Sequence, residues 1–467
     1  MAHGGTRDAI VVGGGISGLA CLWKLVGQGI DAELAEASPR IGGAIRTRRE
    51  GAYLIEEGPN TVLGTPDLLA LIEEVGLGGD VLEADPRLPR YVFFRAELHP
   101  APLGPLALLG TRLLSASGKL RLLREPWIAR RKDDSEESIR DFFVRRFGPE
   151  LHDVLVAPLV SGTFAGDTKR LSVSASFPTV AELERRHGSV VRGFLFRRRS
   201  GVRRPRLISL RDGLETLPAR IGERLRDRIR LESKVVGAVR ASDGTFELTL
   251  AGSDASLRAR SIVSAADAAG AEAVFRHLAA DAVGPLAEIE HPPLVSVSLA
   301  YARADVPHDL RGFGFLVPRD QGVRLLGCIF ASSLFPGRGP SDGAALTAFV
   351  GGATDPDAAD AEGSVALVRE GFRQTLGITA EPVRVLALRR YDRAIPQYGF
   401  GHVARVARIR AAIGRAPGLF VTGNFLEGIS VGECIRMANA TADDVTAFLR
   451  EPQHKPNGRV DFSDRSG

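Results

Sequence analysis

Cysteine is scarce in this sequence, and its three cysteines are too far apart to act together. Cys21, Cys328 and Cys434 form no CxxC pair, and no histidine cluster accompanies them. A disulfide scaffold and a zinc site are therefore excluded, and we expect a reducing compartment. Because no HExxH pattern is present either, we expect no metal and no covalent catalytic residue.

Long apolar runs and lysine are also rare. No window of about 18 apolar residues occurs, so we expect no helix that spans a bilayer. The first apolar run, at residues 10–12, ends in three glycines and does not have the shape of a signal peptide.

The positive charge comes almost entirely from arginine, because only 6 of the 61 basic residues are lysine. The basic residues outnumber the 56 acidic residues. With 44% hydrophobic and 25% charged residues, the chain is globular, and 467 residues allow about three domains.

The first forty residues carry a nucleotide-binding pattern. An apolar strand at residues 9–12 runs into Gly13, Gly15 and Gly18 in GxGxxG spacing, and an apolar helix pattern follows at residues 19–26. The first glycine permits a tight turn, the second lets the backbone approach a pyrophosphate, and the third lets the helix pack closely on the sheet. The N-terminus of the helix favours phosphate groups. This arrangement predicts dinucleotide binding.

Glu36 follows a second strand pattern at residues 30–35 and is the expected acceptor for the ribose hydroxyls. An Arg-x-Gly-Gly segment at 40–43 and a Gly-Pro-Asn segment at 58–60 then extend the pattern beyond a plain NAD domain. In these segments the sequence resembles the two-dinucleotide-binding-domain flavoproteins of the amine oxidase type, which bind FAD. The resemblance implies cofactor contacts from Gly13, Gly14, Gly15, Ile16, Ser17, Gly18, Glu36, Ala37, Arg40, Gly43, Ala44, Gly58, Pro59, Asn60 and Thr61.

Two later parts of the chain are predicted to complete the cofactor site. A strand at 418–421 leads through a glycine-rich segment into a helix at 434–449, which is a second strand–glycine–helix junction. An Asp-Gly pair at 243–244 between two alternating runs predicts a hairpin. The resemblance implies further cofactor contacts from Val235, Tyr391, Asn424, Ile429, Ser430 and Val431.

Three more segments narrow the resemblance to the protoporphyrinogen oxidase family. They are Ala-Pro-Leu-Val-Ser-Gly at 157–162, Ile-Pro-Gln-Tyr at 395–398 with Gly-His at 401–402, and Gly-Ile-Ser-Val-Gly-Glu-Cys at 428–434. The resemblance implies oxidation of protoporphyrinogen IX to protoporphyrin IX in haem biosynthesis, by three hydride transfers to FAD, with dioxygen reoxidising the flavin to give hydrogen peroxide. Oxidation of coproporphyrinogen III, another amine-oxidase-like reaction and a non-enzymatic binding protein of the same ancestral fold are the alternatives.

The family's substrate contacts are carried over residue by residue. An apolar clamp holds the macrocycle, a guanidinium pairs with a propionate, and a glycine carbonyl faces a pyrrole N–H. The matching substrate-binding residues are Phe313 and Leu316 for the clamp, Arg90 for the propionate, and Gly162 and Phe349 for the pocket wall. Asn60 is the one candidate for a catalytic role, and no acid or base is assigned. Without the resemblance, the apolar side chains would be interpreted as core residues and Arg90 as part of a surface ion pair.

Together these patterns predict an α/β fold with a discontinuous Rossmann-type FAD-binding domain, a mixed-sheet substrate domain and a helical membrane-binding domain. The predicted boundaries are 1–85, 205–280 and 388–450 for the FAD domain, 86–99 and 281–387 for the substrate domain, 100–204 for the helical domain and 451–467 for a C-terminal tail.

The helical insert indicates a membrane partner. Residues 112–132 hold seven Arg and Lys side chains and one acid, Glu125, among apolar residues. This pattern suits an anionic membrane surface, and equally an amphipathic helical subdomain with a solvated rim. The resemblance favours monotopic attachment to the cytoplasmic face of the membrane, and it also implies a homodimer and contact with a ferrochelatase. A basic cluster at 197–206 has no recognition motif, so we expect a solvated loop and no nucleic-acid partner.

Overall fold

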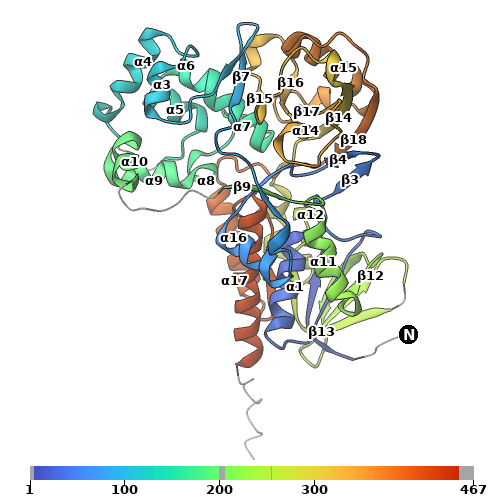
Figure 1. Cartoon of the computed structure of the whole chain (residues 1–467). Coiled ribbons are helices and arrows are strands. Elements are labelled where there is room, and N and C mark those ends of the chain that lie inside the picture. Colours follow the sequence, from blue (N-terminus) through green and yellow to red (C-terminus); the bar gives the residue numbers. More distant parts are fainter. Residues whose placement is uncertain (1–4, 132, 134, 199–205, 254, 452–467) are drawn as a thin grey trace, which may run out of the picture.

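The computed structural model describes residues 5–131, 133, 135–198, 206–253 and 255–451. The predicted tail beyond Glu451 and most of the 197–206 cluster lie outside these residues. Two seven-stranded sheets form the two ends of the molecule, and a group of helices lies beside the second sheet (Figure 1). This arrangement confirms the predicted α/β class with a mixed sheet and a helical insert. The domain boundaries given above stay predictions.

The first sheet is mostly parallel, and strands from three distant parts of the chain meet in it. Its order is β10-β2-β1-β13-β12-β11, and β19 pairs with the end of β13. The predicted hairpin at residues 243–244 is confirmed as the turn between β11 and β12. The strands are β1 (Arg7–Val12), β2 (Ala32–Ala35), β10 (Ile229–Arg230), β11 (Val235–Arg240), β12 (Phe246–Leu250), β13 (Ser256–Ser264) and β19 (Leu419–Val421).

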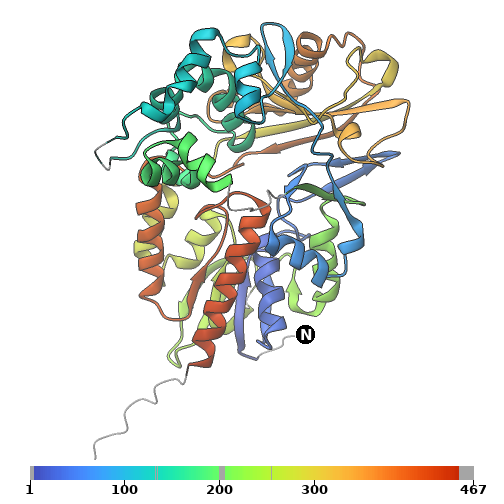
Figure 2. The ribbon, with the colours of Figure 1, turned by 60° about the vertical axis from the view of Figure 1, so that its left-hand side comes forward.

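Helices cover both faces of the first sheet. Ala9 and Val11 pack in the core formed with α1 and α17, whereas Ile10 and Val12 pack in the core formed with α12, α13 and α16. Successive side chains of a strand point to opposite faces, so the unbroken apolar run of β1 is the pattern of a strand buried on both sides. Figure 2 shows α1 and α17 side by side, although they come from opposite ends of the chain. These helices are α1 (Ile16–Gly27), α12 (Ala268–Phe275), α13 (Val283–Ala287), α16 (His402–Gly414) and α17 (Val431–Arg450).

The second sheet is mixed, and one of its faces packs on a long helix. Its order is β18-β14-β17-β16-β15-β7-β8. Phe372 and Val368 of α15 (Ala361–Leu376) are buried against the apolar face of this sheet. The strands are β7 (Arg90–Phe94), β8 (Glu97–Pro100), β14 (Leu294–Ala302), β15 (Gly314–Leu316), β16 (Leu325–Ile329), β17 (Gly343–Gly351) and β18 (Arg384–Tyr391).

Small elements join the two large sheets. The hairpin of β3 and β4 and the three-stranded sheet β5-β9-β6 lie between them. The strands of this junction are β3 (Thr47–Glu50), β4 (Tyr53–Glu56), β5 (Val62–Leu63), β6 (Val81–Glu83) and β9 (Leu207–Leu210). Beside it, α2 (Pro66–Glu74) and α11 (Thr216–Arg224) pack in the core with α1 and α17, and α14 (Ala331–Leu334) packs on β17.

The insert after β8 is helical and has a core of its own, which includes Phe142, Val160 and Phe164. Arg146 and Glu125 form a fully buried ion pair within it. Its helices are α3 (Pro105–Gly110), α4 (Ala116–Leu123), α5 (Ile139–Phe147), α6 (Pro149–Leu151), α7 (Ala157–Phe164), α8 (Val173–Ser176), α9 (Pro178–His187) and α10 (Val190–Arg198). No helix in the described part of the chain is long and apolar enough to cross a membrane.

Candidate active site

The glycine loop after β1 has the shape that the sequence predicts. Gly13 has a φ of 108°, and a Cβ atom there would lie 2.8 Å from the backbone nitrogen of Ala266. A Cβ atom on Gly18 would lie 1.9 Å from the carbonyl oxygen of Gly13, so only glycine lets α1 start this close to the strand. A Cβ atom on Gly15 would meet no atom within 4 Å. Close packing therefore requires glycine at positions 13 and 18. Gly15 leaves open space beside the helix N-terminus, as expected for a pyrophosphate-binding loop.

Glu36 lies at the end of β2 and closes the glycine loop. Its carboxylate accepts hydrogen bonds from the backbone N–H of Gly14 at 2.5 Å and of Ser38 at 2.8 Å. The backbone of Ser233 donates to the Glu36 carbonyl oxygen at 2.8 Å, which brings the chain leading to Val235 beside the acid. The structure therefore brings Glu36 against the glycine loop and places the start of β11 nearby.

Arg40 holds the next segment in place by backbone contacts. Its guanidinium donates to the carbonyl oxygens of Ile41 at 3.0 Å and Gly43 at 2.5 Å. Gly42 donates to the Gly14 carbonyl oxygen at 2.8 Å, and a Cβ atom on Gly43 would lie 3.1 Å from the Cα atom of Gly15. The Arg-x-Gly-Gly segment thus lies directly against the glycine loop, with Gly43 and Ala44 exposed.

Residues 58–61 and Tyr391 form the next part of the predicted cofactor site. The Tyr391 hydroxyl donates to the Glu57 carbonyl oxygen at 2.7 Å, and the Arg389 guanidinium lies 5.0 Å from its ring centroid. Burial raises the pKa of Tyr391. The Asn60 amide donates to the Gly58 carbonyl oxygen at 3.0 Å. The strand β18 of the second sheet therefore reaches the loop that follows β4.

The last predicted cofactor residues surround the start of α17. Ser430 caps this helix, and its hydroxyl accepts the Glu433 N–H at 3.2 Å. Residues 428–432 match GxSxG, but the hydroxyl is used as a helix cap. Asn424, Ile429 and Val431 are half-buried. Because β1, β2 and β19 run parallel, their following loops meet at one edge of the first sheet.

The predicted substrate residues gather on the face of the second sheet that α15 does not cover. Leu316, Gly327, Phe349 and Ser296 are in register across four neighbouring strands, so their side chains point to the same face. A Cβ atom on Gly162 of α7 would lie 2.5 Å from a methyl group of Leu316. Leu316 and Phe349 are half-buried. The structure thus brings the predicted pocket-lining residues together.

Arg90 lies two residues from this row, on the same face. It is in register with Gly314, and its guanidinium lies 5.4 Å from the ring centroid of Phe313. Among the described residues, no carboxylate lies within 4.0 Å of this guanidinium. Arg90 is exposed, and desolvation by the groups around it lowers its pKa, but the guanidinium stays charged. An unpaired cation beside an aromatic ring is suited to a carboxylate ligand.

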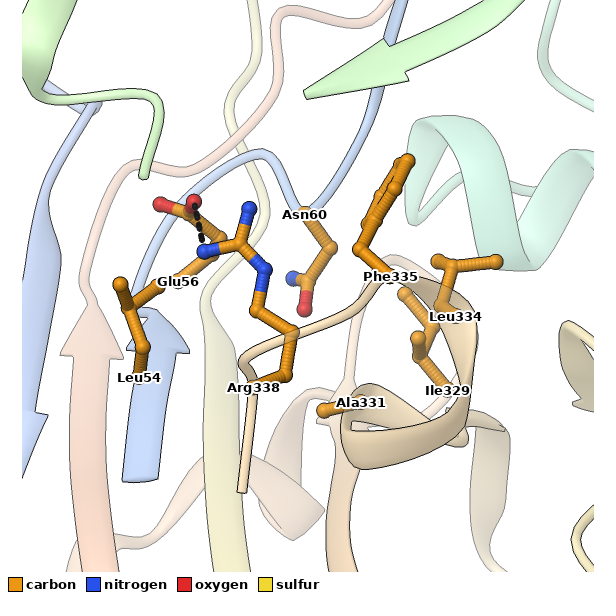
Figure 3. Close-up of a pocket in the computed structure, with 8 residues that line it drawn as sticks. All are labelled: Leu54, Glu56, Asn60, Ile329, Ala331, Leu334, Phe335 and Arg338. Atoms are coloured by element: carbon orange, nitrogen blue, oxygen red, sulfur yellow. Dashed lines mark ion pairs between the residues drawn. The ribbon is translucent and has the colours of Figure 1, made fainter. Parts of the chain in front are cut away.

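A cavity lies where the loop after β4 faces the β16–β17 connection (Figure 3). Arg338 is its buried cation: Nη2 donates to the Ser209 hydroxyl at 2.7 Å and the Leu210 carbonyl oxygen at 2.8 Å, and Nη1 lies 3.8 Å from Glu56. Burial raises the pKa of Glu56, and Thr47 and Leu214 donate to its carboxylate. The cavity is lined by Leu54, Glu56, Asn60, Ile329, Ala331, Leu334, Phe335 and Arg338.

Sequence reasoning missed Glu56 and Arg338. Arg338 lies in a loop without a motif, so no local signal marks it as buried. Glu56 lies just before the predicted cofactor segment at 58–60, and this position was the one sequence signal that could have pointed to it. Of the predicted residues, Asn60 alone lines the cavity. Within the described part of the chain, no group of three His, Cys, Asp or Glu side chains could hold a metal ion.

A comparison with models of protein families identifies the family of the chain. Residues 16–446 match the model described as flavin containing amine oxidoreductase. The chain belongs to this family. It is an FAD-dependent oxidoreductase, and the open space beside Gly15 at the start of α1 is compatible with that cofactor.

Individual relatives agree with the narrower resemblance. The chain is 34% identical to "Protoporphyrinogen oxidase 1, chloroplastic" of Spinacia oleracea, over 96% of this chain and 85% of that protein. It is 28% identical to "Coproporphyrinogen III oxidase" of Bacillus subtilis, over 95% of this chain and 99% of that protein. A solved structure from Exiguobacterium sp. 255-15 has a TM-score of 0.81 at 24% identity, over 95% of this chain and 99% of that one, which shows the shared fold. The predicted resemblance to the protoporphyrinogen oxidase family is confirmed, whereas the individual cofactor and substrate contacts stay predictions.

Proposed function

We propose that this enzyme oxidises protoporphyrinogen IX to protoporphyrin IX in haem biosynthesis. The observation that carries the proposal is the face of the second sheet opposite α15, where half-buried apolar side chains lie near one unpaired guanidinium. Phe313, Leu316 and Phe349 offer the flexible macrocycle an apolar wall, and Arg90 pairs with a propionate. Bound FAD would supply the two-electron acceptor for each of the three oxidations.

The protein's own contribution is to orient and enclose the substrate. Gly162 lies against Leu316, so α7 closes the pocket opposite the sheet and its carbonyl can face a pyrrole N–H. Asn60 lies on the cofactor side and can contact the substrate there. Holding the ring in one orientation removes the entropy loss that a bimolecular reaction would otherwise require. This entropy loss is a large part of the barrier in such reactions.

Coproporphyrinogen III is the second candidate substrate, and the ion pairs of the arginines near the predicted pocket disfavour it. This substrate has four propionates, whereas protoporphyrinogen IX has two. Arg389, on the same sheet face, lies 3.5 Å from Glu57, and Arg338 lies 3.8 Å from Glu56. Each of these two cations has an acid within 4.0 Å, although Arg389 shares Glu57 with Arg46 and Arg48, so Arg90 is the one of the three that has no acidic neighbour among the described residues.

Porphyrin fluorescence tests the assignment. The purified holoenzyme is given protoporphyrinogen IX or coproporphyrinogen III in the dark, and fluorescence is followed above the rate of spontaneous oxidation. We expect the larger kcat/KM for protoporphyrinogen IX. A larger value for coproporphyrinogen III would establish the second candidate, and no turnover of either by a flavin-loaded enzyme would overturn the proposal.

We further propose that the helical insert binds one leaflet of a membrane. Leu106 is 85% and Trp127 78% exposed, and Leu103, Leu120 and Leu123 are also exposed. Exposed arginines at the same insert, including Arg112, Arg124 and Arg130, suit anionic headgroups. The cytoplasmic face, the homodimer and the ferrochelatase contact stay predictions.

Vesicle flotation tests the membrane proposal. The protein should float with vesicles that contain anionic lipid, and Leu106→Asp with Trp127→Asp should abolish flotation without changing kcat on soluble substrate. The matched control is Val383→Asp, a substitution at an equally exposed apolar residue before β18. Equal flotation of both variants would contradict the assignment of this surface.

A further inference from the structure

The Ile-Pro-Gln-Tyr segment and the following histidine lie between the two halves of the site. The Gln397 amide donates to the carbonyl oxygens of Phe164 and Ile395, each at 2.9 Å. Phe164 is the last residue of α7, the helix that carries Gly162 against Leu316. A Cβ atom on Gly166 would lie 2.6 Å from the Gln397 side-chain oxygen. Gln397 therefore fixes the end of the helix that closes the substrate side.

Tyr398 and His402 hold the loop that leads into α17. The Tyr398 hydroxyl donates to the Asn424 carbonyl oxygen, and His402 Nε2 lies 2.9 Å from the Leu426 carbonyl oxygen. Because a carbonyl oxygen only accepts, Nε2 carries the proton, and burial keeps the ring neutral by lowering the pKa of His402. The two rings stack with centroids 4.2 Å apart. Two loop carbonyls are thus satisfied by one stacked pair of side chains.

None of the three side chains is placed to touch a substrate. Tyr398 and His402 are each 2% exposed, and Gln397 is 9% exposed. All three bind backbone carbonyl oxygens of other segments, which leaves them little freedom to approach a ligand. Their polar groups are instead used to fix two backbone segments that lack regular partners at these points.

We propose that Gln397, Tyr398 and His402 are positioning residues that hold the substrate-side helix and the cofactor-side loop in one fixed arrangement. Tyr398 and His402 act on the cofactor side, through the carbonyls of Asn424 and Leu426. Gln397 acts on the substrate side, through the end of α7. This inference rests on the proposed function, since it takes the loop before α17 as facing FAD and α7 as facing the porphyrinogen.

The cofactor-side part is tested by the rate at which FAD leaves the purified holoenzyme, followed by flavin fluorescence without substrate. Tyr398→Phe keeps the stacked ring and removes one hydrogen bond, so we expect release to be about fivefold faster. His402→Leu leaves the Leu426 carbonyl without a donor, and we expect release to be about ten- to a hundredfold faster. His402→Gln keeps a donor at a similar reach and should restore release to within about threefold of the wild type.

The substrate-side part is tested by steady-state kinetics. Gln397→Met has a similar volume and loses both donated hydrogen bonds, so we expect KM to rise about five- to twentyfold while FAD release stays unchanged. The matched control is Tyr301→Phe, at a tyrosine that is 1% exposed on the helix-covered face of the second sheet. It should change neither quantity.

The two readouts separate the possible failures. Equal FAD release in Tyr398→Phe, His402→Leu and the wild type would overturn the cofactor-side role. A faster FAD release in Gln397→Met with an unchanged KM would overturn the division between the two sides. If the wild type holds FAD and responds to the Tyr398 and His402 changes but oxidises no porphyrinogen, the proposed function fails and the cofactor-side inference stands.

Discussion

The two seven-stranded sheets differ in what covers their faces. The first sheet has helices on both faces, so its strands are hidden and only the loops at one edge are available for a ligand. The second sheet packs on α15 with one face, and its opposite face meets α7, α14 and the β3–β4 hairpin, with Leu316 and Phe349 left half-buried. A sheet covered continuously on both sides can bind a ligand at its edge, whereas half-buried apolar side chains between separate covering segments can contact a ligand on the face itself.

The order of apolar and polar residues along the strands reflects this difference. Val11 and Val12 of β1 are both buried, on opposite faces. In β14, Val295 and Val297 enter the core with α15, whereas Ser296 and Ser298 point to the opposite face, where they are also buried. Alternation of apolar and polar residues thus marks the strand whose second face serves the site.

The largest expected effect separates the two faces of the second sheet. Phe372→Ala removes a fully buried ring of α15 and should lower the free energy of unfolding by about 3–5 kcal/mol. Phe349→Ala, at a half-buried ring on the face opposite α15, should cost less than half of that and raise KM instead. Urea denaturation and steady-state kinetics check both. Equal destabilisation would show that Phe349 is as much a core residue as Phe372.

The edge of the first sheet should be sensitive to a single added methyl group. Gly18→Ala places Cβ in contact with the Gly13 carbonyl oxygen, and overpacking of this kind costs about 1–3 kcal/mol. We expect FAD affinity to fall by up to about a hundredfold, measured by titration of the apoenzyme. Gly27→Ala, at the end of the same helix with no atom near the new Cβ, is the control and should bind FAD normally.

The unpaired cation on the face opposite α15 should act on substrate binding alone. Arg90→Ala should raise KM roughly ten- to a hundredfold, since a charged hydrogen-bonded pair contributes about 1.5–3 kcal/mol, and it should leave FAD affinity unchanged. Arg87→Ala is the control, because Arg87 is exposed and pairs with Asp85. An unchanged KM in Arg90→Ala would remove this residue from the propionate role.

The smallest expected effect concerns acid stability. Burial lowers the pKa of His402, which covers the first sheet, and of the more exposed His308 beside the second sheet, from the ordinary value of 6.5. Between the folded and unfolded pKa values the unfolded chain binds more protons, so stability is present above about pH 6.5 and falls as the pH drops below it, by at most about 1.4 kcal/mol per pH unit for each group.

Urea denaturation at pH 7.5 and 5.5 compares the two histidines. His402→Gln should reduce the loss of stability on acidification more than His308→Gln does, because His402 is the more deeply buried ring. The opposite order would show that charging His308 is the costlier step.

Much of the candidate cofactor site could be predicted from the sequence because it depends on backbone geometry within short segments. The positive φ of Gly13 and the contact of Gly18 with the Gly13 carbonyl oxygen are local, so the glycine spacing alone is informative, whereas the contact of Gly13 with Ala266 comes from a distant strand. Ile-Pro-Gln-Tyr with the following Gly-His indicated the family, but the contacts of its side chains with Phe164, Asn424 and Leu426 could not be predicted from the motif. Those partners are distant in sequence.

The sequence by itself determined the glycine loop, the acid after β2 and the family to which the chain belongs. Only the tertiary structure decided which face of the second sheet carries the half-buried apolar side chains, that Arg90 has no acid beside it, and that Arg338 has one. The physical reason is that a charge is matched or unmatched by groups that the fold brings from distant segments. A local pattern specifies a turn, whereas the electrostatic balance of a pocket exists only after the sheets have assembled.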